Sequence, residues 1–161
     1  MRFSISVVGD TDIAAKFMSA PSSVNELINL RFQELGQYLQ NYVQEQKLSG
    51  QSLNRGTGEL ADSITFDVQD TGSGAVLNIG PKGVPYAAIQ ERGGTTSAHE
   101  ILPNKVSALH FFWGGKEVFF KVVNHPGSRI KATGYMRDTL TENQAYIRNT
   151  IANAVNQGLG F

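Results

Sequence analysis

The most regular pattern in this chain is a row of apolar residues between positions 22 and 47, which predicts a long α-helix. The row repeats at steps of three and four residues, the spacing that keeps side chains on one helical face. Its members are Val24, Leu27, Ile28, Phe32, Leu35, Leu39, Tyr42 and Val43. Gly36 lies inside this helix, where glycine costs about 1 kcal/mol relative to alanine. Close approach of another backbone is one explanation for Gly36, and chance is the other.

Alternation of apolar and polar residues predicts strands elsewhere, because successive side chains of a strand point to opposite faces. The turn residues Asp70–Gly74 separate two such segments, and the diglycine Gly114-Gly115 separates another two, so we expect two hairpins. In the second hairpin the alternating aromatic residues are expected to face the core. The expected strands cover residues 2–8, 64–69, 75–79, 106–113 and 117–123.

Further helical segments and loops complete the prediction. The other expected helices are a short one over about 10–19, a single turn over 59–63 and a closing helix over about 134–157. The expected loops are residues 47–58, 95–104 and 124–128. The whole pattern indicates one α+β domain over residues 1–161. Its mainly antiparallel sheet of hairpins is packed by the long helix of the N-terminal half and by the C-terminal helix.

The stretch of residues 84–96 is expected to be a structural joint. Pro85 suits the first turn of a helix, since its missing N–H is not needed there. Gly93 or Gly94 can adopt the left-handed conformation that ends a helix. Between them lies a short apolar helical face made of Tyr86, Ala87, Ala88 and Ile89. We therefore expect one buried helical turn between a strand and a loop.

Charge is distributed unevenly along the chain, although the formal net charge is zero. Residues 1–70 hold five Lys or Arg against nine Asp or Glu, and residues 71–161 hold nine against five. The two parts carry −4 and +4, a pattern that favours head-to-tail contact between copies. Charged residues are only 17% of the chain, below the usual quarter, which leaves uncharged surface for protein contact.

The composition also limits the cellular compartments and the kinds of functional site that we expect for the chain. The chain has no cysteine, so disulfides and thiolate chemistry are excluded. No apolar run approaches the roughly 18 residues of a membrane span. The first eight residues alternate, unlike the continuous apolar core of a signal peptide. We expect a protein that stays in the compartment where it is made, with no membrane partner and no cofactor.

Histidines are the main candidates for enzymatic chemistry. His99, Glu100 and His110 could bind a metal if they converged, and a metal-dependent enzyme using them is the alternative from another functional class. Their separations match no short ligand motif. His110 in an apolar strand and His125 beside a proline turn are common structural situations. The sequence therefore favours no catalytic, cofactor or metal site.

Two other kinds of site are weaker still. Asp10 with Asp12, and Asp67 with Asp70, could form acid–base pairs, but such residues at strand ends and turns are ordinarily solvated caps. Basic residues beside aromatic ones are similar in kind to a nucleic-acid surface, although lysines on a strand also protect a sheet edge. The residues of that group are Phe111, Phe112, Trp113, Lys116, Lys121, Arg129, Lys131, Tyr135 and Arg137.

Several sequence blocks occur in a distinctive order between about residues 47 and 140. The most specific is Pro85–Thr95, with its Tyr-Ala and Glu-x-Gly-Gly-Thr elements. The others are 47–51, 55–60 with Ser63-Ile64, Pro103 with Ala108-Leu109, and 125–128 with Tyr135-Met136 and Leu140. Together they resemble a family of tailed-bacteriophage morphogenesis proteins, known as tail-component, virion-morphogenesis or tail-completion proteins. One departure is Arg92, where the family favours an aromatic residue.

The resemblance implies a small α+β structural subunit without enzymatic activity. Such subunits form a ring, usually six-fold, at the head-proximal end of the tail, where the ring terminates or completes the tail tube and joins it to the neck of the head. The implied partners are other copies of the chain, the major tail tube protein and a head-closure or neck protein. Double-stranded DNA passes through the channel without sequence-specific binding. The implied location is the virion, after assembly in the bacterial cytoplasm, and a minor tail component elsewhere in the tail is the alternative.

The polar connection over about 48–58 is expected to be mobile before assembly. Because it is too polar to pack alone, we expect it to become ordered against a neighbouring copy or the tube. The oppositely charged halves are expected to meet between copies, with a sensitivity to salt. The residues expected at the assembly interface are Ser49, Gly50, Arg55, Thr57, Arg92 and Lys131.

Overall fold

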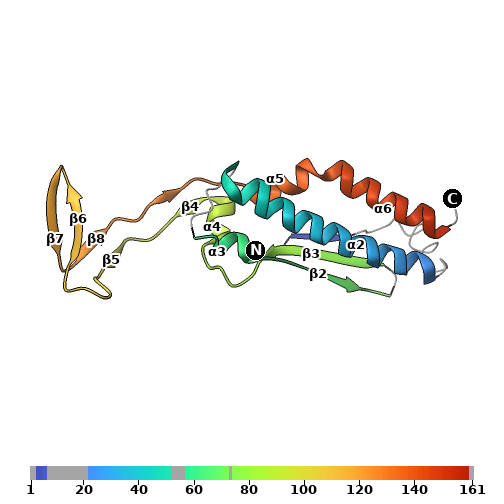
Figure 1. Ribbon diagram of the computed structural model, residues 1–161, viewed down its shortest axis with the longest axis horizontal. Coiled ribbons are helices and arrows are strands. Elements are labelled where there is room, and N and C mark those ends of the chain that lie inside the picture. Colours follow the sequence, from blue (N-terminus) through green and yellow to red (C-terminus); the bar gives the residue numbers. More distant parts are fainter. Residues whose placement is uncertain (1–2, 7–21, 52–56, 73, 160–161) are drawn as a thin grey trace.

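The computed structural model describes residues 3–6, 22–51, 57–72 and 74–159. It has a body, in which helices pack on a small antiparallel sheet, and a long two-stranded arm that projects from one end of the body (Figure 1). The arm comprises residues 94–130, and the other described residues form the body. The fold is α+β with several small antiparallel sheets, which confirms the expected fold class.

The sheet of the body has three antiparallel strands in the order β1-β3-β2. The strands are β1 (Phe3–Ser6), β2 (Ile64–Asp70) and β3 (Ala75–Pro81). The hairpin expected around residues 70–74 is confirmed, with Asp70 opposite Ala75 and Ile64 opposite Pro81. The first expected strand is confirmed over Phe3–Ser6. Its remaining residues and the helix expected at 10–19 lie outside the described residues.

Two helices lie side by side (Figure 1), α2 (Ser22–Tyr42) and α6 (Gln144–Leu159), and α2 packs on β2 and β3 of the sheet. The apolar face expected on α2 is confirmed, because its central members are buried in the core with residues of β2 and β3. The core includes Val24, Ile28, Phe32, Leu35, Leu39, Ile64, Leu77 and Ile79. Gly36 faces the Phe66 side chain of β2 and not another backbone. Close backbone approach occurs instead at Gly158, where an added Cβ would lie 2.8 Å from Cα of Val24.

The long helix ends within one residue of the position that its apolar pattern predicts. After α2 the chain continues as η1 (Val43–Gln51), a π-helical segment whose kink at Ser49 and Gly50 has non-helical backbone angles. The expected loop over 48–58 is therefore wrong at Leu48, whereas Ser49 and Gly50 leave the helical conformation as expected, and residues 52–56 lie outside the description. Leu48, the last helical residue before the kink, is buried in the core, although its polar neighbours conceal it in the sequence. The next element is α3 (Glu59–Asp62), as expected.

The closing helix is two helices, not one. α5 (Tyr135–Glu142) ends before Asn143, and α6 begins after it. Asn143 is buried, its Nδ2 donates to the Thr139 carbonyl oxygen at 2.9 Å, and its Oδ1 accepts the Tyr38 hydroxyl at 2.9 Å. Asn143 thus lies between the two helices, where its bonds to α5 and α2 stabilise the break.

A polar cluster joins η1 to the end of α5. The buried Lys47 ammonium lies 2.6 Å from Oε1 of Glu142, and the Tyr42 hydroxyl donates to Oε2 at 2.8 Å. The Lys47 ammonium, followed by the Tyr42 hydroxyl, holds the pKa of Glu142 below its usual value. The same hydrogen bond raises the pKa of Tyr42, since it favours the protonated phenol. The positive charge of Lys47 is compensated by the Glu142 carboxylate. Glu142 is the last residue of α5, so this ion pair connects η1 to the helix break.

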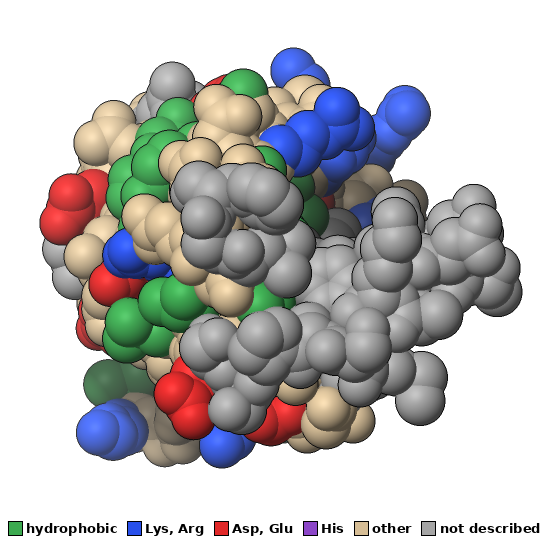
Figure 2. All heavy atoms as spheres, turned by 90° about the vertical axis from the view of Figure 1, so that its right-hand side faces the viewer, with side chains coloured by type: hydrophobic (Ala, Val, Ile, Leu, Met, Phe, Trp, Pro, Cys, Tyr) green, Lys and Arg blue, Asp and Glu red, His purple; other side chains and the backbone are tan. Residues whose placement is uncertain are grey.

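The end of the body away from the arm shows a band of hydrophobic side chains at the surface with acidic side chains beside it (Figure 2). Within the described residues, none of the helices combines the length and the apolar character required to span a bilayer. The other end of the body carries the joint from which the arm projects (Figure 1).

Candidate interaction surface

The arm is one long β-hairpin whose strand pairing is interrupted twice. The lower interruption lies near the body, and the upper interruption lies near the far end of the arm. Its outgoing strands pair in reverse order with its returning strands, so that β4 pairs with β9, β5 with β8 and β6 with β7, all antiparallel. These strands are β4 (Gly94–Thr95), β5 (His99–Ile101), β6 (Leu109–Trp113), β7 (Lys116–Phe120), β8 (Val123–His125) and β9 (Arg129–Ile130). The diglycine Gly114-Gly115 forms the turn at the far end. The expected second hairpin is thus confirmed, but β6 starts at Leu109 rather than at residue 106, and β7 ends at Phe120 rather than at residue 123.

The loops expected at 95–104 and 124–128 are wrong in part. β5 and the end of β4 lie in the first range, and β8 extends into the second. β5 and β8 have three residues each, too few to show an alternating pattern in the sequence. Each of them is defined by its pairing with the other across the arm. His99 lies opposite His125, and Thr95 lies opposite Arg129.

The lower interruption keeps the two legs in register. Three residues separate β4 from β5, and three separate β8 from β9. The legs are linked there, because Thr96 N–H donates to the Ser128 carbonyl oxygen at 2.9 Å and Ser128 N–H donates to Oγ1 of Thr96 at 2.8 Å. Gly127, with a φ of +92°, fits only without a Cβ, which would clash with the Thr96 carbonyl oxygen. The lower arm is therefore a continuous ribbon.

The upper interruption is asymmetric and reorients the end of the arm. Seven residues, 102–108, separate β5 from β6, whereas Lys121 and Val122 alone separate β7 from β8. The extra length on the outgoing leg lets the β6–β7 hairpin stand across the direction of the ribbon (Figure 1). We call this β6–β7 unit, residues 109–120, the tip hairpin.

The tip hairpin has two faces of different chemistry. Because opposite residues of an antiparallel pair share a face, one face carries Leu109, Phe111, Trp113, Lys116, Val118 and Phe120. We call this the apolar tip face, and Phe111 and Phe120 stack on it with ring centroids 5.7 Å apart. The opposite face carries His110, Phe112, Glu117 and Phe119. There the His110 ring stacks on Phe119 at 4.7 Å, and its Nε2 lies 2.6 Å from Oε1 of Glu117.

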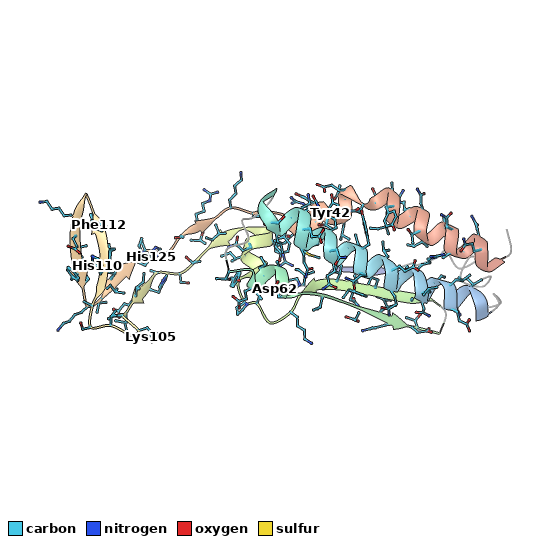
Figure 3. The ribbon with its side chains drawn as sticks, in the orientation of Figure 1. Tyr42, Asp62, Lys105, His110, Phe112 and His125 are labelled. Atoms are coloured by element: carbon cyan, nitrogen blue, oxygen red, sulfur yellow. The ribbon has the colours of Figure 1, made fainter. Side chains whose placement is uncertain are left out.

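The aromatic residues of the tip hairpin face solvent, so the expectation that they pack in the core is wrong. Phe112, Trp113 and Phe119 are 72%, 67% and 64% exposed. The physical reason is distance, because the arm holds the hairpin away from the body (Figure 3). The sequence does hold a signal of this exposure: Phe111, Phe112 and Trp113 are consecutive, so that both faces of the hairpin carry aromatic rings and one core cannot cover them all.

The root of the arm is held by the joint between α4 (Ala87–Arg92) and α5. Thr133 N–H donates to the Gln90 carbonyl oxygen at 2.9 Å, and Gly134 N–H donates to the Glu91 carbonyl oxygen at 3.1 Å. The joint expected in this stretch is therefore present, although its buried residues are Ala87 and Glu91, while Tyr86 and Ala88 are exposed. The expected apolar face is wrong because α4 turns a carboxylate toward α5.

That carboxylate belongs to Glu91, which is 5% exposed. Its oxygens accept the backbone N–H groups of Met136 at 2.9 Å and Arg137 at 3.1 Å, in the first turn of α5. A negative charge at this position also interacts favourably with the helix dipole. Tyr135 is buried beside it, and burial, reinforced by the Glu91 charge, raises the pKa of its hydroxyl. Glu91 thus connects the start of the arm with the point where the chain returns to the body.

Gly93 ends α4 in a different conformation from the one expected. Its φ of +73° is positive, but its ψ of −179° is extended, so the chain passes directly into β4. A Cβ at Gly93 would lie 2.8 Å from the Ala132 backbone nitrogen on the returning leg. The two legs therefore leave the body in close contact.

Three exposed cations surround the root of the arm. Arg92, Arg129 and Lys131 line an open depression of about 590 Å³ with the backbone around Gly93 and Ile130. None of the three has an ion-pair partner among the residues that the structure describes. This cationic surface is open to an acidic partner.

The residues expected at an assembly interface fall into separate places. Arg92 and Lys131 lie together at the root of the arm. Ser49 and Gly50 are exposed at the kink of η1, Thr57 is exposed before α3, and Arg55 lies outside the described residues. The structure thus brings together only the first pair, and interface contact by any of them stays a prediction.

The alternative metal-site residues do not form a group. His99 lies beside His125, with ring centroids 5.1 Å apart, while His110 is bonded to Glu117 in the tip hairpin. Glu100 lies opposite Asn124, on the face of the ribbon away from His99. Over the described ranges, no three His, Asp or Glu side chains are placed to hold one metal ion.

Comparison with known proteins gives no relative. No protein-family model matches the chain, and it matches neither a curated protein nor a solved structure.

Proposed function

We propose that this chain is a structural subunit of a tailed-bacteriophage tail, which assembles with other copies into a ring at the head-proximal end. The ring, six-fold in this proposal, terminates or completes the tail tube and joins it to the neck. Its partners are the major tail tube protein and a head-closure or neck protein, and DNA passes through its channel. The sequence blocks between residues 47 and 140 support the family, and the arm supports the assembly.

The arm is the observation that carries the proposal. It holds a row of large hydrophobic residues in solvent, and an apolar surface of this kind marks a site of protein contact. The row comprises Ile101, Leu102, Val106, Phe112, Trp113, Phe119, Phe120 and Val122. A two-stranded hairpin is at best marginally stable alone in water, so contact with a partner would stabilise the tip hairpin. These features suit a subunit that works within an assembly.

The location can be tested on particles produced by the genome that encodes the chain. We expect mass spectrometry of purified particles to detect the chain at a few copies per tail, far below the tube protein. A peptide tag after residue 161, visualised by electron microscopy, should mark the head-proximal end. Labelling at another position would support the minor-tail-component alternative, and absence from finished particles would exclude the proposal.

A further inference from the structure

The apolar tip face needs a partner that its own chain does not supply. Trp113 and Phe120 on this face are 67% and 43% exposed. Beside them is an open hollow of about 260 Å³, lined by Phe111, Trp113, Phe120, Val122, Val123 and Asn124. The tip hairpin lies at one end of the long axis of the molecule, far from the paired helices of the body (Figure 1). The arm therefore cannot cover its own tip with those helices.

The charge of the arm indicates an acidic partner. Residues 92–131, the arm with its root, hold six Lys or Arg against two Asp or Glu. Residues 1–91 hold six against ten, and residues 132–161 hold two of each. The excess of +4 lies on the arm, and an equal and opposite excess lies on the part of the chain that includes α2 and the sheet. A second copy is thus electrostatically complementary to the arm.

The helix pair of the body carries exposed apolar residues with acidic residues beside them. Leu30 and Tyr38 on α2 and Tyr146 on α6 are 52%, 37% and 49% exposed. Tyr38 and Tyr146 touch across the helix pair, with ring centroids 4.7 Å apart. The acidic residues Glu26, Glu34 and Glu45 are exposed along α2 and η1, and Glu34 pairs with Arg31 of the same helix at 2.7 Å. We call these three apolar and three acidic residues the helical face.

The outer face of the sheet is a poorer match. Its positions alternate with the buried ones and include the polar residues Ser4, Thr65, Asp67, Gln69 and Asn78, beside the half-buried Val76. Aromatic side chains gain little from covering such a surface, whereas tyrosines and tryptophans are enriched among the residues that contribute most to binding. The helical face is therefore the better site for the tip hairpin.

We infer that the arm of one copy docks, apolar tip face inward, on the helical face of a second copy. Lys116 lies opposite Trp113 on the apolar tip face, so that the docked hairpin brings a cation to the glutamates of α2. Donor and acceptor surfaces are different parts of the chain, which makes the contact heterologous and lets each copy bind two neighbours. The inference rests on the self-assembly in the proposed function and names the two surfaces that make it.

The test uses two variants with opposite defects. The donor variant Phe111→Ser/Phe120→Ser alters the apolar tip face, and the acceptor variant Glu26→Lys/Leu30→Arg alters the helical face. Each alone should associate at least about 30-fold more weakly than the wild type, the loss expected for contacts worth 2 kcal/mol or more. Sedimentation velocity over a concentration series measures this change. Circular dichroism checks that both variants keep the folded body.

Mixing the two variants gives the decisive readout. The donor variant keeps an intact helical face and the acceptor variant keeps an intact arm, so the mixture should form one-to-one dimers and nothing larger. Trp113 is the only tryptophan of the chain. Its fluorescence in the acceptor variant should shift to the blue when the donor variant is added, because docking removes the indole from water.

Matched controls use the other faces of the same elements. Phe112→Ser changes an exposed aromatic residue on the opposite face of the tip hairpin, and Thr65→Arg adds a cation to the outer face of the sheet. Both should associate like the wild type. If the donor and acceptor variants also associate like the wild type, or if the mixture forms no dimer, the inference is wrong although the chain still assembles. Absence from phage particles with one-to-one dimers intact would instead overturn the proposed function alone.

Discussion

The ring of Phe66 occupies the space that a Cβ at Gly36 would need. The ring belongs to β2 and the glycine to α2, and Cε2 of Phe66 would lie 2.7 Å from such a Cβ. The absence of a side chain at Gly36 therefore lets α2 pack directly on the Phe66 ring of the sheet. In the body this contact connects the two layers at the middle of the core.

Replacing Gly36 by alanine should destabilise the body. Overpacking against Phe66 costs about 1–3 kcal/mol, which exceeds the roughly 1 kcal/mol that alanine gains in helix propensity. Chemical denaturation measures the free energy of unfolding. Gln33→Ala, an exposed position of the same helix, should change it by less than about 0.5 kcal/mol. In Gly36→Ala/Phe66→Leu the smaller side chain should recover part of the loss, and a purely additive double variant would contradict the contact.

Replacing Glu91 by glutamine should loosen the root of the arm. The amide offers one acceptor oxygen where the carboxylate offers two, so one buried N–H of α5 loses its partner at a cost of about 1–3 kcal/mol. Hydrogen exchange should quicken at Met136 and Arg137. Arg92→Gln, at the next and exposed position, serves as the control. Unchanged exchange in Glu91→Gln would show that the carboxylate does not hold the start of α5.

Stability should depend on the charge of Glu142 in acid. Lys47 and Tyr42 lower the pKa of this carboxyl from 4.5 in the folded state. A lowered folded pKa contributes stability above the unfolded value and loses it as the pH falls through the folded value. Glu142→Gln should therefore be less stable than the wild type by a constant amount above about pH 5, and the difference should shrink below that. A pH-independent deficit in Glu142→Gln would exclude the linkage.

Replacing Gly127 by alanine should open the arm and leave the body folded. The new Cβ would clash with the Thr96 carbonyl oxygen, and the φ of +92° is unfavourable for any residue with a side chain. Limited proteolysis should then cut residues 94–130 faster than in the wild type. Gly114→Ala is the control, since its φ is also positive but open space surrounds it. Equal protease resistance in the two variants would mean that the packing between the legs is unimportant.

Local pattern was sufficient where one element buries one face. The apolar row over 22–47 predicted α2, and alternation around Asp70–Gly74 predicted the β2–β3 hairpin, because each period records which side chains avoid water. The same logic missed Leu48, whose polar neighbours hide a buried residue. It also joined α5 and α6 into one helix, because nothing in the spacing shows that Asn143 is bonded to Tyr38 on another helix.

The candidate interaction surface was less accessible to sequence reasoning. The sequence predicts the Gly114-Gly115 turn and its flanking strands, yet their alternation wrongly places the aromatic residues in the core. β5 and β8 were missed because three residues show no period and gain their structure from pairing across the arm. Glu91 was overlooked as a cap, since its two N–H partners lie 45 and 46 positions further along the chain.

By itself the sequence determined the α+β class, the long helix, both hairpins and the opposite charges of the two parts of the chain. These follow from composition and from the periods of neighbouring residues. Only the tertiary structure decided that the second hairpin stands on an arm, with its rings in solvent and its root held by Glu91. Whether an apolar side chain is buried depends on what lies opposite it, and that is settled by contacts between residues far apart in the chain.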